Sequence, residues 1–149
     1  MLRILNIGDS TSSLETLEKI KNNDYSPFEV RIQNSHIVEL NKEIGMKVFK
    51  NNMLFINSKT LWEIMHPIGG KGKHHYHGLT PNNILEALKT MRHSKDVNLS
   101  YDGRYIIISL AKDVNEKYLA IIVDPNGTTK DSRNKRVARI VTIYPQKKK

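Results

Sequence analysis

Residues 97–110 read Val-Asn-Leu-Ser-Tyr-Asp-Gly-Arg-Tyr-Ile-Ile-Ile-Ser-Leu. The pair Asp102-Gly103 stands between two runs rich in β-branched and aromatic residues, which is typical of a tight β-hairpin. Two more runs of strand composition follow, and no helical periodicity interrupts them. The pattern therefore predicts four strands in a meander, over residues 97–101, 105–110, 118–123 and 137–144. The linker over residues 125–135 is long for a hairpin and is a candidate substrate-contacting loop.

Upstream of this meander, helical patterns alternate with short strand patterns. Thr80 and Pro81 are a good N-cap and first helical residue for a helix that runs to about Arg92. Ser58 is expected to cap a shorter helix. Other helices are expected over residues 13–22 and 37–44, and short strands over residues 2–7, 28–32 and 52–56.

Helices that precede an antiparallel meander favour an α+β fold. We expect a helical N-terminal part followed by a four-stranded antiparallel sheet. The 149 residues fit one domain over residues 51–149, with an appended N-terminal α/β element of unknown role over residues 1–50.

The composition excludes several classes of protein. The chain has no cysteine, which excludes disulfides and thiolate metal sites and fits a reducing compartment. No apolar run approaches the ~20 residues that span a bilayer, and no signal peptide is visible. We therefore expect a cytoplasmic protein with no membrane partner.

Positive charge is concentrated in the second half of the chain. Residues 1–70 contain eight basic and eight acidic residues, whereas residues 71–149 contain sixteen basic and seven acidic residues. The whole net charge of +9 thus lies from residue 71 onward, which favours a polyanion such as nucleic acid as the partner. A solvated basic surface is the plainer alternative. The expected nucleic-acid-binding residues are Lys71, Lys73, Arg133, Lys135, Arg136 and Arg139.

The segment from Gly69 to Pro81 carries the strongest chemical signal. It contains four glycines, two lysines and three of the six histidines, and it leads directly into a predicted helix. RNA cleavage without a metal needs a base, an acid and cations that stabilise the charged transition state. Histidine can act as either base or acid near neutral pH. Lys71, Lys73 and Arg104 could supply the cations.

Other interpretations of this segment compete with catalysis. Zinc could bind His74, His75 and His77, but the fourth ligand would have to be His66, His93 or a carboxylate. A P-loop requires Ser or Thr after Gly-Lys, and here His74 follows Gly72-Lys73, so this motif fails. The segment could also be a flexible basic loop with incidental histidines. His36 and His66 fit packing or surface roles better.

Several short motifs occur in one order along the chain: Lys73 to Pro81, then Ile84-Leu85, then Asp102 to Tyr105, then Val141 to Pro145. In this order they resemble the phage-associated branch of the barnase–EndoU–colicin–RelE nuclease superfamily, over about residues 50–145. The resemblance implies a metal-independent endoribonuclease of the toxin or effector type, which needs no cofactor. It also implies RNA, tRNA included, as substrate, and a cognate immunity or antitoxin protein as a partner.

The resemblance assigns roles to five catalytic candidates. His77 would be the first of the acid–base pair and His74 the second, while Arg104 would bind the scissile phosphate. Thr142 and Tyr144 share one face of the last strand by period two, and the family places a hydroxyl residue there to orient the phosphate. The extra residue His75 leaves the identity of the pair open.

The function expected is RNA cleavage by transesterification to a 2′,3′-cyclic phosphate. One alternative is a non-catalytic nucleic-acid-binding protein on the same fold. Another is a phage structural or partner-binding protein in which residues 1–50 do the work.

Overall fold

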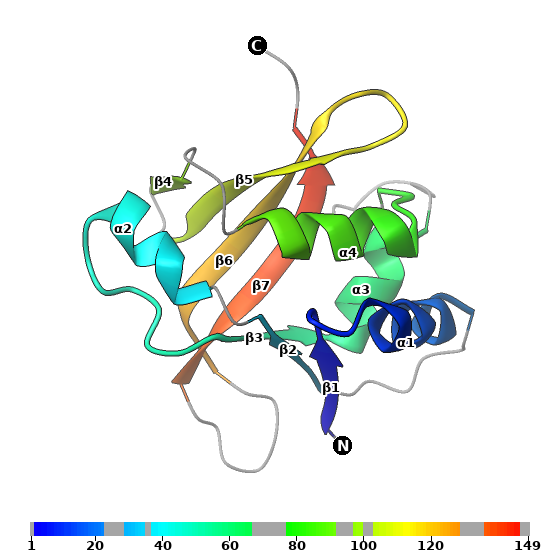
Figure 1. Cartoon of the computed structure of the whole chain (residues 1–149), viewed down its shortest axis with the longest axis horizontal. Helices are drawn as coiled ribbons and strands as arrows, with labels where there is room; N and C mark the ends of the chain where they lie inside the picture. The colour runs from blue at the N-terminus through cyan, green and yellow to red at the C-terminus, as the bar shows by residue number, and fades with distance from the viewer. Residues whose placement is uncertain are drawn as a thin grey trace.

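A computed structural model describes residues 2–22, 29–34, 37–66, 77–91, 97–99, 103–128 and 136–146. Within these residues, seven strands form one mixed sheet accompanied by four α-helices (Figure 1). The strands are β1 (Leu2–Asn6), β2 (Glu29–Gln33), β3 (Met53–Asn57), β4 (Val97–Leu99), β5 (Tyr105–Lys112), β6 (Tyr118–Thr128) and β7 (Arg136–Pro145). The helices are α1 (Ser10–Asn22), α2 (Leu40–Ile44), α3 (Ser58–Ile64) and α4 (Pro81–Thr90), with a 3-10 turn η1 (Ile37–Glu39) before α2.

The prediction of a helical N-terminal part followed by a four-stranded antiparallel sheet is wrong. The four predicted strands are present as β4 to β7, but β1, β2 and β3 belong to the same sheet, whose order is β1-β2-β3-β7-β6-β5-β4. The two sets of strands meet where Phe55 of β3 pairs in parallel with Arg139 of β7. Local sequence patterns predict strands but not pairing between residues so far apart, and this is the reason for the error. The chain is still α+β.

The strands also bear on the predicted boundary near residue 50. Strands β2 and β3 lie on either side of it and pair antiparallel from Glu29 opposite Asn57 to Gln33 opposite Met53. The division into two units remains a prediction.

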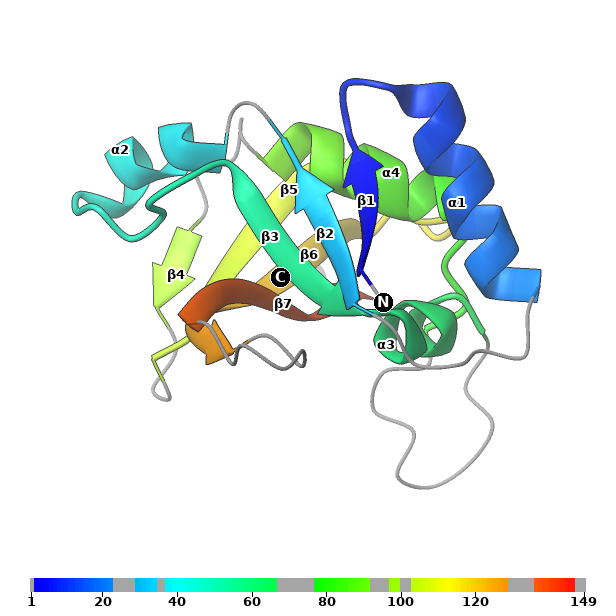
Figure 2. The ribbon, with the colours of Figure 1, turned by 90° about the horizontal axis from the view of Figure 1, so that it is seen from below.

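The hydrophobic core lies on one face of the sheet. Alternate strand residues such as Ile32, Ile56 and Ile121 are buried in one cluster with α4 residues such as Leu88. Helices α1 and α4 lie on the same side of strands β6 and β7, as the two perpendicular views show (Figures 1 and 2). Because successive side chains of a strand point to opposite faces, the intervening residues form a second face. The second face includes Ile4, Arg31, Phe55, Ile122, Thr142 and Tyr144, none of which belongs to the core cluster.

Helices α3 and α4 each begin at a residue whose side chain caps the helix. The prediction for Thr80 and Pro81 is confirmed, because the Thr80 hydroxyl accepts the Asn83 N–H at 3.0 Å and the Asn83 side chain accepts the Thr80 N–H at 3.0 Å. The prediction for Ser58 is wrong by one residue. Asn57 caps α3 by accepting the Lys59 N–H at 2.8 Å, and this places Ser58 inside the helix. Among the described residues, no helix has the length and apolar composition needed to cross a bilayer.

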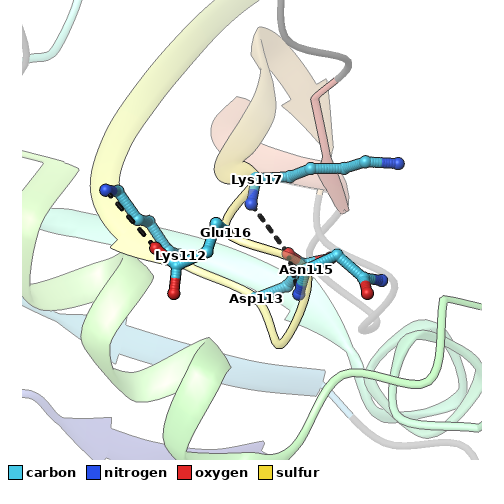
Figure 3. Close-up of polar contacts among 5 residues, drawn as sticks. All are labelled: Lys112, Asp113, Asn115, Glu116 and Lys117. Atoms are coloured by element: carbon cyan, nitrogen blue, oxygen red, sulfur yellow. Dashed lines mark hydrogen bonds and ion pairs between the residues drawn. The ribbon is translucent and has the colours of Figure 1, made fainter.

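The β5–β6 turn fixes the start of β6 (Figure 3). The Asp113 carboxylate accepts the N–H groups of Asn115 at 3.0 Å and Lys117 at 2.9 Å, and Lys112 lies 3.7 Å from the Glu116 carboxylate. At its other end β6 continues to Thr128, so the β6–β7 connection is shorter than the predicted linker. The remainder of that linker lies outside the described residues.

Candidate functional site

His77 lies in a short segment that is held against the end of α3. The N–H of Gly78 donates to the His66 carbonyl at 2.8 Å, and the N–H of Leu79 donates to the Ile64 carbonyl at 3.0 Å. Leu79 is buried in the core, and Gly78 has a φ of +64°, a left-handed conformation that favours glycine. The Gly-Leu-Thr-Pro sequence thus fixes the backbone just after His77 between α3 and α4.

His77 meets the last strand at Tyr144. The two ring centroids are 6.2 Å apart and their planes are tilted by 42°. Tyr144 lies near the end of β7, where it pairs with Ala120 of β6. Both rings are half-buried, and the Nε2 atom of His77 is shielded from solvent. The structure therefore brings His77, the described histidine of the His-rich segment, next to the last strand, and the sequence predicted these two parts to form one site.

Thr142 lies two residues before Tyr144 and on the same face. The pairings of Thr142 with Ile122 and of Tyr144 with Ala120 alternate with that of Ile143 and Ile121, which are both in the core. The Oγ1 atom of Thr142 is buried and has no hydrogen-bond partner among the described residues. A buried hydroxyl without a partner costs about 1–3 kcal/mol. It is thus a group that a ligand could satisfy.

Burial also affects the acidity of Tyr144. Removal of the phenol from water raises the pKa of Tyr144 above its ordinary value of about 10. The phenol therefore keeps its proton at neutral pH. It can donate a hydrogen bond or a proton to a substrate, but it cannot act there as a base.

Arg104 stands apart from this group. It directly precedes β5, in which Ile108 pairs with Ala120, the partner of Tyr144. Four residues along the strands and two strand spacings across the sheet separate the two backbones by about 13 Å in one direction and about 10 Å in the other. The structure does not bring Arg104 next to Tyr144, and its role in phosphate binding remains a prediction.

Arg139, predicted to bind nucleic acid, forms an ion pair inside the protein. Its guanidinium Nη1 donates to the Glu29 carboxylate at 2.9 Å, and the two side chains are only 13% and 7% exposed. This contact joins β7 to β2. Arg139 therefore has a structural role, and its positive charge is paired inside the protein.

The other predicted site residues are not described. His74, Lys71, Lys73, Arg133 and Lys135 lie outside the described residues, and so does the side chain of Arg136, which is on β7 opposite Thr128. Their roles remain predictions.

The zinc alternative depends on two residues outside the described part, His74 and His75. Elsewhere, in the part that the structure describes, no group of three or more metal-ligating side chains occurs. His66 is half-buried, stacks on Trp62 with ring centroids 3.9 Å apart, and its Nδ1 lies 2.6 Å from the Trp62 carbonyl oxygen. A packing role for His66 is thus confirmed.

Sequence reasoning missed three polar or aromatic residues on the second face of the sheet. Glu29 and Arg31 alternate with buried Val30 and Ile32, and Phe55 alternates with core residues of β3. Charged residues at every second position of a short apolar run were the available signal. Their convergence depends on the β2–β3 and β3–β7 pairings, which the run alone does not specify.

Comparisons with protein-family models, with curated proteins and with solved structures found no match to this chain.

Proposed function

We propose that this protein is a metal-independent endoribonuclease whose cleavage site is built on His77, Tyr144 and Thr142. The observation that supports this most is the ring pair of His77 and Tyr144, which places an imidazole beside a phenol 6.2 Å away. The charge of residues 71–149 supports a polyanionic substrate. The resemblance to toxin and effector nucleases suggests the same reaction, a cytoplasmic RNA target and a cognate inhibitor protein.

The reaction is a transesterification. A base removes the proton of the ribose 2′-hydroxyl, and the 2′-oxygen attacks phosphorus. The bond from phosphorus to the 5′-oxygen breaks, and an acid returns a proton to that oxygen. The products are a 2′,3′-cyclic phosphate and a 5′-hydroxyl.

The described residues can fill part of this scheme. His77 would carry one of the two proton transfers, through Nδ1 or after a shift of its segment, because Nε2 is shielded. The protonated Tyr144 phenol and the Thr142 hydroxyl would donate hydrogen bonds to phosphate oxygens, where charge develops in the transition state. His74 is proposed for the second proton transfer.

A second candidate function is nucleic-acid binding without cleavage. One observation favours it: the Nε2 atom of His77 is shielded from solvent, which hinders proton transfer at that atom. A binding protein on this fold would need the basic charge but not the histidines.

The test is incubation of a labelled single-stranded RNA with the purified chain and excess chelator. We expect cleavage to a 2′,3′-cyclic phosphate, a loss of about 10²- to 10⁴-fold in rate for His77→Ala, and no cleavage when the 2′-hydroxyl is replaced by hydrogen. Tyr144→Phe should be slower than wild type. Tyr118→Phe, at an exposed tyrosine of β6, is the matched control and should be unchanged.

Each other outcome rejects part of the proposal. Intact RNA that remains bound to the wild-type chain would favour the binding function. Cleavage that the chelator abolishes would favour a metal site. Intact and unbound RNA would reject both functions.

A further inference from the structure

The second face of the sheet presents an aromatic side chain between two arginines. Phe55 of β3 pairs directly with Arg31 of β2 on one side and with Arg139 of β7 on the other. Paired residues of neighbouring strands point to the same face, with Cβ atoms about 4.5–5.5 Å apart in an antiparallel pair. The pairings therefore place Phe55 between two arginine positions on neighbouring strands, in a row of three residues, and the Arg139 side chain extends from β7 across β3 to Glu29 on β2.

This row is not part of the hydrophobic core. Phe55 and Arg31 are half-buried, and neither Phe55 nor Ile4, which lies on the other side of Arg31, packs against the core cluster that contains the helices. Ile4, opposite Arg31 on β1, is 50% exposed. A large aromatic ring in such a place is partly open to solvent, and its exposed apolar surface is available to a ligand.

Polar groups beside Phe55 have unused hydrogen-bonding capacity. Glu29 is 6% exposed, and its Oε1 atom is buried with no hydrogen-bond partner among the described residues. The Nε atom of Arg31, two residues along the same strand and face, is also buried without a partner in that part of the chain. Buried polar atoms are nearly always hydrogen-bonded, so an acceptor and a donor left open beside one ring indicate a place for a polar ligand.

The charge of the row fits a polyanion. Glu29 neutralises Arg139 through their ion pair. Among the residues that the structure describes, no carboxylate forms an ion pair with Arg31, which therefore supplies the positive charge next to Phe55. Arginine beside an aromatic ring suits nucleic acid, because bases stack on rings while guanidinium groups contact phosphates.

The row also lies on the same face as the proposed cleavage site. Arg139 and Tyr144 are five residues apart on β7. They share a face because of a bulge at Val141: Ile140 pairs with Val123, whereas Thr142 pairs with Ile122. Their backbones are about 15 Å apart along the strand. A strand of RNA that crosses the face from Phe55 toward Tyr144 would extend over a few nucleotides. A duplex could not do so in the same way, because its bases are stacked on each other and their flat faces are not accessible.

We propose that the second face of the sheet binds single-stranded RNA, with one base stacked on Phe55 and an adjacent phosphate on Arg31. This inference rests on the proposed function, since it names the form of RNA and the residues that hold it beside the His77–Tyr144 pair.

The experiment measures binding separately from cleavage. A labelled single-stranded oligonucleotide with 2′-O-methyl groups cannot undergo transesterification, and its dissociation constant is measured by fluorescence anisotropy at several salt concentrations. The comparison is a hairpin with 2′-O-methyl groups whose duplex stem contains the same sequence and its complement. The variants are Phe55→Leu, which removes the ring and keeps an apolar side chain, and Phe55→Tyr, which keeps the ring.

We expect the wild type to bind the single strand more tightly than the duplex. Phe55→Leu should weaken binding of the single strand about tenfold, and Phe55→Tyr should retain it. Arg31→Gln should lower the salt dependence of binding by about one phosphate contact. Two controls are variants at exposed residues outside the sheet. Met46→Leu should leave the dissociation constant for the single strand unchanged, and Lys47→Gln should leave its salt dependence unchanged.

Two results would overturn the inference: equal binding by wild type and Phe55→Leu, or duplex binding as tight as that of the single strand. Failure of the inference differs from failure of the proposed function. If wild type cleaves ordinary RNA and Phe55→Leu has the same KM, the inference fails and the cleavage function stands. If Phe55-dependent binding occurs without cleavage, the inference stands and the catalytic proposal fails.

Discussion

The Arg139 guanidinium on β7 donates to the Glu29 carboxylate on β2 at 2.9 Å, across β3, which lies between these two strands. Both side chains are almost completely buried. A buried ion pair often stabilises a protein no more than an apolar pair of the same volume does. Loss of one partner, however, destabilises the protein strongly, because it leaves an uncompensated charge out of water. The contact therefore ties three strands together and makes each partner depend on the other.

The first prediction follows from this dependence. Arg139→Met leaves the Glu29 carboxylate buried and unpaired, and the free energy of unfolding should fall by about 3 kcal/mol. The double variant with Glu29→Leu should recover most of this loss, because it removes both charges. Urea denaturation measures both values. Glu86→Gln, which breaks an exposed pair with Lys89, should change stability by at most about 1 kcal/mol; a similar loss there would contradict the prediction.

Gly127 is the neighbour that leaves room for Arg139. A Cβ atom at Gly127 would lie 2.6 Å from Cγ and 2.7 Å from Cδ of Arg139, too close for either to remain in place. Gly127→Ala should displace the arginine and destabilise the protein by about 1–3 kcal/mol. Gly8→Ala is the control, since its new methyl group would meet only the Asn6 side chain at 3.3 Å.

The same displacement predicts non-additivity. Because Gly127→Ala and Arg139→Met disturb the same ion pair, their combined effect should be smaller than the sum of the single effects. A thermal or urea unfolding cycle of the four proteins tests this. Full additivity would mean that the alanine acts through some contact other than Arg139.

At Thr142, we expect the requirements of stability and of function to conflict. Thr142→Val removes a buried hydroxyl without a partner among the described residues and keeps the side-chain volume, so the protein should become about 1 kcal/mol more stable. RNA cleavage or binding should weaken at the same time. Thr90→Val is the matched control: the Thr90 hydroxyl donates to the Glu86 carbonyl at 2.8 Å and accepts the Leu110 N–H at 3.1 Å. That variant should lose stability.

Because of Tyr144, we expect the stability of the folded protein to change with pH in the alkaline range. Its pKa is raised by burial in the folded protein, so the folded state holds the phenol proton more tightly than the unfolded state does. This contribution is fully present below the unfolded value of about pH 10 and is lost as pH rises through the folded pKa. The melting temperature of wild type should therefore fall more between pH 9 and pH 11 than that of Tyr144→Phe. An equal fall in the melting temperatures of the two proteins over this pH range would contradict the effect of burial on the Tyr144 pKa.

Local signals predicted the parts of this fold better than their assembly. The Thr80 cap, Pro81 and the apolar face of Ile84 and Leu88 predicted α4, because these interactions are all within one helix. The face shared by Thr142 and Tyr144 also followed from strand periodicity. The placement of β1 to β3 could not be predicted this way, because it depends on a contact between Phe55 and Arg139 that no local pattern encodes.

In the candidate site, too, local motifs were predictable from the sequence and contacts that depend on strand register were not. The meeting of His77 and Tyr144 was predicted, since both lie in motifs whose chemistry is visible in the sequence. The distance of Arg104 from them was not, because it depends on the register of β5 against β6. The role of Arg139 in an ion pair was hidden for the same reason: its partner Glu29 is 110 residues away along the chain.

The single described pairing between β3 and β7 also has a consequence for folding during synthesis: β3 cannot pair with its neighbour in the sheet until β7 has been made. Strands β1 to β3 are synthesised early, but the central neighbour of β3 is the last strand of the sheet to leave the ribosome. Contacts so distant in sequence form late and slowly. Tyr144 belongs to β7, so a nascent chain that ends before β7 contains His77 but not its aromatic neighbour. Any activity of this site would therefore begin only after synthesis of β7.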